Sequence, residues 1–359
     1  MPETLCQPGS DNARGGLRGE RARPTPGLIA ALCDGFGFDK LYAWRDLGGS
    51  SCLNLLMARK GARFVARVYR PYVTEARLTD IQGVRGLLKQ WGIPCADVLP
   101  ALSEAPYIRY QGRLIEAERY VVHDGNMDTL PRLERALPLL GRMTSALRRV
   151  SGLSQDGMRP LFSNHMPFEQ IQSATRKGCE RIRSWNPNAY ELQLAEASLR
   201  LASCVQQAGG GLFEGLPRQL AHGDFWDNNV LFLGETVALV EDFDFMGERR
   251  RIDDIALTLY YARNYLKNAG IPESQHAAAL KRLLNAYESG LDTPLAAGER
   301  AALPIAIASQ PLWSIGGWIA TLDSEHAARV HASDMLEYVE AAQRILDHLA
   351  QWQRMFGGH

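Results

Sequence analysis

The chain lacks a net charge and a long apolar run. Its 359 residues carry 40 Lys and Arg against 40 Asp and Glu, so the basic surplus of a general nucleic-acid binder is missing. No run of about 18 apolar residues occurs, which predicts no transmembrane helix and no membrane partner. The most apolar stretch, residues 301–320, contains Pro304 and Pro311, and we expect a buried helical region there.

Cysteine motifs are also missing. The six cysteines are Cys6, Cys33, Cys52, Cys95, Cys179 and Cys204. None forms a Cys-x-x-Cys pair, and none stands at metal-ligand spacing with a histidine. A chain of this length buries a large core without disulfides, so we predict reduced thiols in a cytoplasmic protein.

The N-terminal segment has no apolar core of the kind that a secretory signal needs. Residues 1–24 are rich in Gly, Pro and Arg, which predicts a disordered leader. A transit peptide would be poor in acids, and Glu3, Asp11 and Glu20 disfavour that alternative. The pattern then predicts an N-terminal lobe over 25–122 and a helical C-terminal lobe over 123–359.

The N-terminal lobe is predicted to consist of short strands and one main helix. Glycine-rich residues 47–51 precede a hairpin of two strands, 52–57 and 63–69, with a turn at Lys60-Gly61. Apolar residues at helical spacing predict a helix over 74–91 that Gly92 ends. The remaining expected elements are a short helix over 27–32 and strands over 107–110 and 114–121, which turn at Gln111-Gly112.

The C-terminal lobe is predicted to be helical apart from one strand-rich region. We expect a strand–turn–strand region over 220–245 and helices from Ile252 to the end, with turns near 270–272 and 290–294. The other expected helices cover 130–150, with a kink or break at Pro138, and 168–207, with an interruption at 186–188.

Three oxygen-bearing side chains stand at an informative spacing around a predicted hairpin. Asp224 follows a strand, Asn229 opens the next apolar run, and Asp242 ends the run after that. Antiparallel pairing across the turn 234–236 brings Asn229 and Asp242 together. An amide and a carboxylate oxygen suit Mg²⁺, and a carboxylate free of metal accepts a hydroxyl proton. Each piece alone is an ordinary turn or strand end, but the joint spacing favours phosphoryl transfer of the kinase type.

These residues carry a family resemblance. His222-Gly223-Asp224, with Asn229 and the Asp242-Phe243 pair, resembles the aminoglycoside phosphotransferase family, which includes choline kinase-like and type II homoserine kinase-like enzymes. Residues 47–54, 64–71 and 253–256 extend the similarity. The resemblance implies a two-lobed α+β fold like that of protein kinases, with a small β-rich N-terminal lobe and a large, mostly helical C-terminal lobe.

The resemblance also implies roles for individual residues. It implies that Asp224 is the catalytic base and that Asn229 and Asp242 are magnesium ligands. His222 is expected to support the loop by hydrogen bonds, whereas Asp254 is expected to cap a helix. Asp244 either assists a second metal ion or is structural.

For the nucleotide, which is ATP or GTP, the resemblance implies contacts in the N-terminal lobe. The implied residues are Gly48, Gly49, Ser50 and Ser51 in the phosphate loop, Arg67 as the phosphate-contacting cation, and Arg119, Tyr120 and Val121 at the adenine hinge. Many family members have Lys where this chain has Arg67, and a structural salt bridge is the alternative. Asp80 is the best-placed acid to pair with this cation.

The sequence gives little information about the acceptor substrate. Beyond Ile255 acids only slightly outnumber bases, which disfavours a strongly cationic substrate. Aromatic residues there, Tyr260, Tyr261, Tyr265, Trp313 and Trp318, line a substrate pocket or belong to the core. We predict transfer of a γ-phosphoryl group to a hydroxyl of a small molecule: an antibiotic, sugar, nucleoside or amino alcohol. The alternatives are a protein Ser/Thr kinase of the stress-response type and a nucleotide-binding module without catalysis.

Overall fold

The computed structural model describes residues 21–38, 43–49, 52–59, 61–322 and 324–357. These residues divide into two units. The first contains the described residues up to Gly86 together with Ala96–Val122, and the second contains Leu87–Cys95 and the described residues from His123 onward. Most of the predicted leader, residues 1–20, lies outside the described residues.

The first unit is built on an antiparallel sheet. The sheet has the order β1-β2-β3-β6-β4, and β5 also pairs with β6. Its strands are β1 (Ala43–Asp46), β2 (Leu53–Arg59), β3 (Ala62–Val68), β4 (Val98–Leu99), β5 (Ile108–Tyr110) and β6 (Arg113–Arg119). The predicted hairpin is confirmed as β2–β3, whereas β1 was not predicted.

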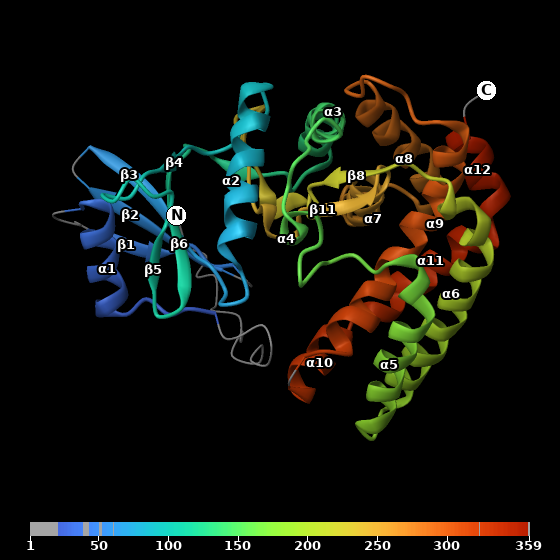
Figure 1. Ribbon diagram of the computed structural model, residues 1–359. Coiled ribbons are helices and arrows are strands. Elements are labelled where there is room, and N and C mark those ends of the chain that lie inside the picture. Colours follow the sequence, from blue (N-terminus) through green and yellow to red (C-terminus); the bar gives the residue numbers. More distant parts are fainter. Residues whose placement is uncertain (1–20, 39–42, 50–51, 60, 323, 358–359) are drawn as a thin grey trace. The chain divides into compact units, whose positions relative to one another are not determined.

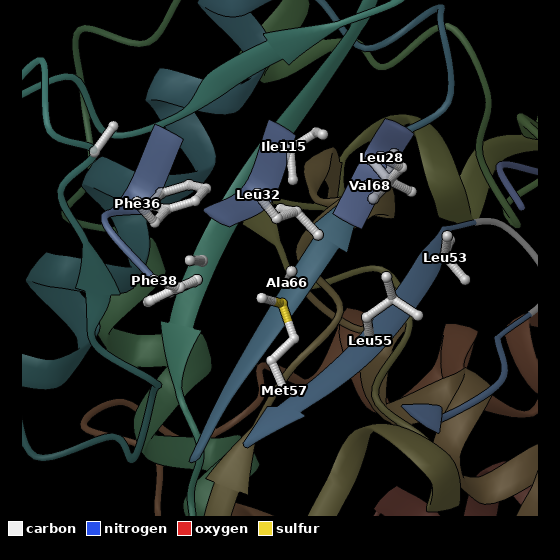
Figure 2. Packing of buried hydrophobic residues seen from close by; sticks show 12 residues of the cluster. Leu28, Leu32, Phe36, Phe38, Leu53, Leu55, Met57, Ala66, Val68 and Ile115 are labelled. Carbon is white, nitrogen blue, oxygen red and sulfur yellow. The ribbon is translucent and has the colours of Figure 1, made fainter. Parts of the chain in front are cut away.

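One face of this sheet carries a hydrophobic core. Helix α1 (Pro26–Phe36) places apolar residues at every fourth position, which puts them on one side of the helix. Figure 2 shows the resulting cluster, in which Leu28, Leu32 and Phe36 lie with Leu53, Leu55 and Met57 of β2, Ala66 and Val68 of β3, and Ile115 of β6. Full burial of each large side chain contributes about 1.5–3 kcal/mol.

The alternate residues of β3 and β6 place charged groups on the other face. Arg67 lies opposite Glu116 in the β3–β6 pairing. Helix α2 (Glu75–Gln90) contributes Arg85, whose Nη1 lies 2.9 Å from Glu116 Oε1 and whose Nη2 lies 2.7 Å from Glu118 Oε1. The predicted helix over 74–91 is thus confirmed, with Gly92 following in the left-handed conformation at φ 79°.

The second unit contains two short groups of strands. Strands β9 (Val230–Leu233) and β10 (Thr236–Val240) form the predicted hairpin, and β7 (Gly125–Asn126) pairs with β9. Strand β8 (Arg218–Ala221) pairs with β11 (Gly247–Arg250), a strand that the sequence did not predict. The pairing of β8 with β11 brings the chain before His222 next to the chain after Asp242.

Helices make up most of the second unit (Figure 1). They are α3 (Leu130–Leu147), α4 (Gln155–Met158), α5 (Ile171–Ser184), α6 (Ala189–Glu214), α7 (Asp253–Asn268), α8 (Glu273–Glu288), α9 (Ala297–Trp313), α10 (Glu325–Ala332), α11 (Met335–Asp347) and α12 (Leu349–Gly357), with a π-helical turn at Ser314–Ile319. The predicted interruption at 186–188 is confirmed, because Asn188 caps α6. Helix α3 continues through Pro138, so the break considered there is wrong.

Two further sequence predictions concern burial and cysteine chemistry. The apolar stretch 301–320 is largely buried in α9 and the π-helical turn that follows, as predicted. The described cysteines, Cys33, Cys52, Cys95, Cys179 and Cys204, form no disulfide. Among the described residues, no helix combines the length and apolar character needed to cross a membrane.

Candidate active site

The loop between β8 and β9 brings together two of the three predicted catalytic side chains. Asn229 Nδ2 donates to Asp224 Oδ2 at 2.8 Å and to the backbone oxygen of Asp224 at 2.9 Å. Asn229 closes a 3₁₀ turn (Asp227–Asn229) that leads directly into β9. Both contacts use the amide nitrogen of Asn229, so its carbonyl oxygen is left to face another partner.

Asp242 reaches the same region through the β9–β10 hairpin. The Glu241 N–H donates to the Asn229 backbone oxygen at 2.9 Å, which continues the pairing of the two strands to the residue before Asp242. Asp242 itself adopts the left-handed conformation, with φ 61° and ψ 68°. Asp tolerates this conformation better than most residues, although it still costs of order 1–3 kcal/mol.

The electrostatic environment of Asp224 is unusual for a carboxylate. Burial raises its pKa well above the usual range, and the neighbouring charges of Asp242 and Asp244 raise it further. The hydrogen bond from Asn229 and the charge of Arg249 act in the opposite direction. Asp224 nevertheless remains partly exposed, so a ligand can reach it.

Asn164 is a site residue that the sequence analysis missed. It is buried, and its Nδ2 lies 2.5 Å from Asp224 Oδ1, so each oxygen of Asp224 accepts from one amide. Arg249 of β11 holds the segment around Asn164 through its Nη2, 2.9 Å from Ser163 Oγ, and its Nη1, 3.5 Å from Asn164 Oδ1. No local motif marks Asn164, because it lies 60 residues before Asp224.

His222 supports the loop by hydrogen bonds, in line with its expected role. Its Nδ1 accepts from the Asp224 N–H at 3.2 Å, and its Nε2 lies 3.1 Å from the Glu241 backbone oxygen. This pattern requires the neutral ring with its proton on Nε2. Burial lowers the pKa of His222 and keeps the ring neutral, although Asp254 and Asp242 work in the other direction.

Asp254 has a different role from the one expected. Its two oxygens accept from the backbone N–H groups of His222 and Gly223, each at 2.8 Å, rather than from its own helix. Gly223 is required beside it, because its φ is +83° and an added Cβ would lie 2.3 Å from the Phe245 oxygen. Asp254 therefore ties the loop that carries Asp224 to the first turn of α7.

In the first unit, the predicted nucleotide loop is only partly described. Ser50 and Ser51 lie outside the described residues. Gly48 and Gly49 have φ values of +90° and +107°, and the Gly48 oxygen accepts from Asn54 Nδ2 at 3.3 Å and from Arg21 Nη2 at 3.1 Å. Arg21, which falls within the predicted leader, is also paired with Asp46 at 2.6 Å.

Arg67 is a buried residue of β3 on the charged face of the sheet. The pKa of Glu118 is raised to about 7, mainly by burial and also by the charge of Glu116. The charges of Arg85 and Arg67 lower this pKa and so limit the rise. Glu118 is thus an acid within electrostatic reach of Arg67 that the sequence analysis did not consider. The pairing of Arg67 with Asp80 stays a prediction.

The predicted adenine hinge follows β6. The Arg119 N–H donates to the Asp97 oxygen at 2.9 Å, and the Tyr120 N–H donates to the Arg63 oxygen at 3.1 Å. The Arg63 guanidinium also lies 4.3 Å from the centre of the Tyr120 ring. Both N–H groups already donate to backbone oxygens of the first unit. A contact of Arg119, Tyr120 or Val121 with the adenine ring would therefore use other backbone groups of this segment.

The donor set around Asp224 fits a divalent metal ion. Among the described residues, no group of three or more His, Cys, Asp or Glu side chains is arranged to hold a metal ion. Asn229 and Asp242 offer one amide and one carboxylate oxygen, and Mg²⁺ commonly takes one or two protein oxygens with phosphates and water. The mutual repulsion that raises the pKa of Asp224 is the kind of effect that a cation offsets.

The site combines a loop that holds Asp224 between two short strands with a left-handed Asp242 at the end of a hairpin, an arrangement suited to phosphoryl transfer. The family model described as "Phosphotransferase enzyme family" matches residues 48–302. The chain belongs to this family. The predicted family and the α+β protein-kinase-like fold are both confirmed.

Similar sequences are named homoserine kinases. The chain is 30% identical to the homoserine kinase of Afipia carboxidovorans over 328 residues, which cover 87% of this chain and 89% of that protein. It is 29% identical to the homoserine kinase of Rhodopseudomonas palustris over 198 residues, or 54% of this chain. That match spans about half of the Rhodopseudomonas protein, at 51% of its length.

Solved structures with similar folds are also kinases. A microcompartment-associated aminopropanol kinase gives a TM-score of 0.64 at 17% identity and covers 91% of this chain and 98% of its own. An amicoumacin kinase in complex with AMP-PNP and Ca²⁺ gives 0.62 at 15% identity, covering 89% and 94%. An aminoglycoside phosphotransferase from Alicyclobacillus acidocaldarius gives 0.61 at 14% identity, covering 93% and 98%.

Proposed function

We propose that this protein is a small-molecule kinase that transfers the γ-phosphoryl group of ATP to a hydroxyl group, with Asp224 as the base. The observation that carries the proposal is the orientation of Asp224. Asn164 binds one of its oxygens and Asn229 binds the other, while Asp254 fixes the backbone just before it. A carboxylate held this firmly, and still partly exposed, is suited to receive a proton from a ligand.

In the proposed reaction, the acceptor hydroxyl donates its hydrogen bond to a remaining lone pair of the Asp224 carboxylate. The acceptor oxygen forms a bond to the γ-phosphorus as the bond to the β,γ-bridging oxygen breaks, and ADP leaves with that electron pair. The hydroxyl proton passes to Asp224 and then to solvent. The raised pKa of Asp224 makes it a stronger proton acceptor than an ordinary carboxylate.

Asn229 and Asp242 would hold a Mg²⁺ ion through the amide oxygen and the carboxylate. Bound there, the ion would neutralise charge on the β- and γ-phosphates. In the first unit, Gly48, Gly49, Ser50, Ser51 and Arg67 are proposed to contact the phosphates, because backbone N–H groups without nearby Cβ atoms and a forked guanidinium both suit anions. Asp80 and the segment Arg119–Val121 keep their proposed roles as cation partner and adenine hinge.

For the acceptor, we propose a small hydroxyl-bearing amino acid, and homoserine is the first compound to test. The Afipia relative that supports this choice carries the name homoserine kinase and matches this chain over most of both lengths. Amino alcohols follow as the second class, since an aminopropanol kinase shares the fold.

The test of the base compares Asp224→Asn with the unmodified protein by ADP release and by nucleotide titration calorimetry. Removing a general base should lower kcat by about 10²–10⁴-fold. Nucleotide affinity should stay within a few-fold, because Asp224 is not a proposed metal ligand. The matched control is Asp347→Asn at an exposed position of α11, which should leave both values unchanged. Unchanged turnover in the Asp224 variant would remove the assignment.

The acceptor is tested by a screen for ADP release against homoserine, amino alcohols, sugars, nucleosides and aminoglycosides, with ATP and GTP in parallel. Homoserine should give the highest kcat/KM. Labelling of a protein in a lysate without turnover of any small molecule would favour a protein kinase. Nucleotide binding without transfer to any acceptor would favour a non-catalytic module.

A further inference from the structure

The second unit contains a pocket of about 640 Å³ to which the proposed reaction assigns no role. It lies between the chain around His165, the ends of α4 and α6, and β11. Pockets of 300–1,000 Å³ are typical of small-molecule sites. Asp224 is not among its lining residues, although Ser163 and His165, on either side of Asn164, are.

Arginines slightly outnumber glutamates in the lining of this pocket. Its charged lining residues are the arginines Arg159, Arg218, Arg249 and Arg250 and the glutamates Glu169, Glu214 and Glu248. Burial lowers the pKa of His165 to about 3, so its ring is neutral near pH 7 and adds no charge. The lining therefore carries a small positive excess.

Arg250 provides a hydrogen-bond donor that the protein leaves unused. The residue is 4% exposed, and Asp253 Oδ1 lies 3.0 Å from its Nε and 2.8 Å from its Nη2. The Phe213 ring lies 3.9 Å from its guanidinium carbon. Its Nη1 is buried and has no hydrogen-bond partner among the described residues. Because this atom has almost no accessible surface, a ligand oxygen reaches it only after neighbouring side chains move, and the bond would then satisfy a buried donor that has no acceptor in the described part of the chain.

Arg249 and Arg218 add charge without a close carboxylate partner in their hydrogen bonds. Arg249 is 5% exposed, and its Nη2 donates to Ser163 Oγ at 2.9 Å and to the Phe245 oxygen at 2.7 Å, both uncharged. Arg218 is exposed and donates to the Glu248 backbone oxygen at 3.4 Å. The carboxylates of Asp254, Asp253 and Asp224 also act on the Arg249 charge, so the exposed guanidinium of Arg218 is the better suited of the two to bind a carboxylate or phosphate.

We propose that this pocket binds a small organic anion with a carboxylate or phosphate group, held by Arg218 and Arg250, and that the occupant acts on Asp224 through Arg249 and Asn164. The connection consists of two contacts. Arg249 Nη1 lies 3.5 Å from Asn164 Oδ1, and Asn164 Nδ2 binds Asp224 Oδ1. An anion that attracts Arg249 toward the pocket weakens the contact between Arg249 and Asn164. Asn164 can then shift and change the orientation of the Asp224 carboxylate.

The binding test is titration calorimetry of the full chain with inorganic phosphate in one arm and malonate in the other. Saturating ADP and Mg²⁺ are present, so that phosphate-binding groups elsewhere are occupied, and no turnover is needed. A failure of the proposed kinase activity would therefore leave this test intact. At least one of the two anions should bind saturably, and the arm that does so identifies the ligand as phosphate-like or carboxylate-like.

The diagnostic variant is Arg218→Gln, since Arg218 is exposed and its replacement should preserve the fold. It should weaken anion affinity at least tenfold, while the control Arg282→Gln, at an exposed position of α8, should bind as the unmodified protein does. Melting temperatures confirm that both variants are folded. The absence of saturable binding in both arms, or equal affinity in Arg218→Gln, would overturn the proposed site.

The proposed coupling between the anion pocket and Asp224 can also be tested by anion binding. If the anion affects the contacts of Asp224, a change in those contacts must affect anion affinity by the same factor. Asn164→Ala releases Arg249 Nη1 from its contact with Asn164, so the anion should bind several-fold more tightly in this variant. Equal affinity in Asn164→Ala and the unmodified protein would show that the pocket and the base are independent.

Discussion

Asn164 Nδ2 and Asp224 Oδ1 lie 2.5 Å apart, although 60 residues separate them in the chain. With Asn229 on the other oxygen, the Asp224 carboxylate is held from both sides. Its plane is therefore fixed by two elements that belong to different parts of the second unit. A base whose orientation is fixed in advance needs little rearrangement when the acceptor binds.

Replacing Asn164 should impair catalysis more than binding. In Asn164→Ala, the Asp224 carboxylate keeps its contacts with Asn229 but can rotate, so we expect kcat to fall about 10–100-fold, as is typical when an outer-shell partner of a site is lost. Nucleotide affinity, measured by calorimetry, should stay within a few-fold. A purely structural role predicts instead a lower melting temperature with kcat unchanged at a temperature where the variant is folded.

The matched control for this experiment is Gln193→Ala, at an exposed position of α6 where the side-chain amide donates to Glu340 Oε1 at 3.2 Å. It should leave kcat and the melting temperature close to those of the unmodified protein. A similar fall of kcat in both variants would contradict a specific role for Asn164.

Asp254 should be important for stability as well as for the loop. Asp254→Ala leaves the buried N–H groups of His222 and Gly223 without their acceptors, at about 1–3 kcal/mol each. We expect the free energy of unfolding, measured by urea denaturation, to fall by about 2–5 kcal/mol. Asp254→Asn keeps one acceptor oxygen and should lose less. A loss below about 1 kcal/mol in the alanine variant would mean that water or a shifted loop satisfies these groups.

Arg85 holds two buried carboxylates in the first unit. Burial by itself raises the pKa of Glu116. The charge of Arg85 and the hydrogen bonds to Glu116 outweigh burial and lower this pKa to about 2. Arg85→Met removes the guanidinium that is paired with Glu116 and Glu118 and leaves the charge of Arg67 nearby, and removing one partner of a buried ion pair costs about 3–5 kcal/mol. Denaturant titration should show this loss, and Arg85→Lys should recover part of it.

A second variant separates charge from packing in this cluster. Adding Glu116→Gln to Arg85→Met removes the carboxylate that Arg85 keeps charged, so the double variant should be more stable than Arg85→Met alone. Equal stability of the two would show that the loss comes from the missing hydrocarbon contacts of Arg85 rather than from charge.

His165 should make stability depend on pH. Burial lowers its pKa to about 3, against an ordinary value of 6.5, so the folded chain keeps the ring neutral while the unfolded chain takes up a proton below about pH 6.5. This contribution to stability is complete above pH 6.5 and decreases by up to about 1.4 kcal/mol per pH unit as the pH falls toward 3.

The measurement compares urea unfolding of the unmodified protein and His165→Gln at pH 7 and pH 5. The variant should lose less stability between the two values, by about 1–2 kcal/mol. His222 is also kept neutral by burial, and it contributes equally to both proteins, so it cancels in the comparison. Identical pH dependence would show that His165 is solvated in solution.

The sequence predicted most reliably those features that depend on residues close together in the chain. The hairpin β9–β10 follows from two apolar runs and a short turn, and it accounts for the nearness of Asn229 and Asp242. The loop function of His222 follows from its place beside Asp224. In the first unit, the hairpin β2–β3 likewise follows from two apolar runs and the short turn between them.

Other features depend on contacts between distant segments. The carboxylate of Asp254 stands in the first turn of a helix, where the sequence favours a cap, yet it binds the chain 31 and 32 residues earlier. Arg85 meets Glu116 and Glu118 only because α2 packs on the sheet. Charge complementarity across such distances has no periodic signature in the chain.

By itself, the sequence determined the family, the two strands around the proposed magnesium ligands and the identity of the proposed base, because these depend on short spacings that backbone geometry converts directly into proximity. Only the tertiary structure decided that Asn164 and Asn229 share the two oxygens of Asp224, that Asp254 anchors the loop, and that arginines of β8 and β11 surround a pocket. Those contacts arise when separate segments fold against one another, and side-chain packing, rather than local propensity, selects which residues meet.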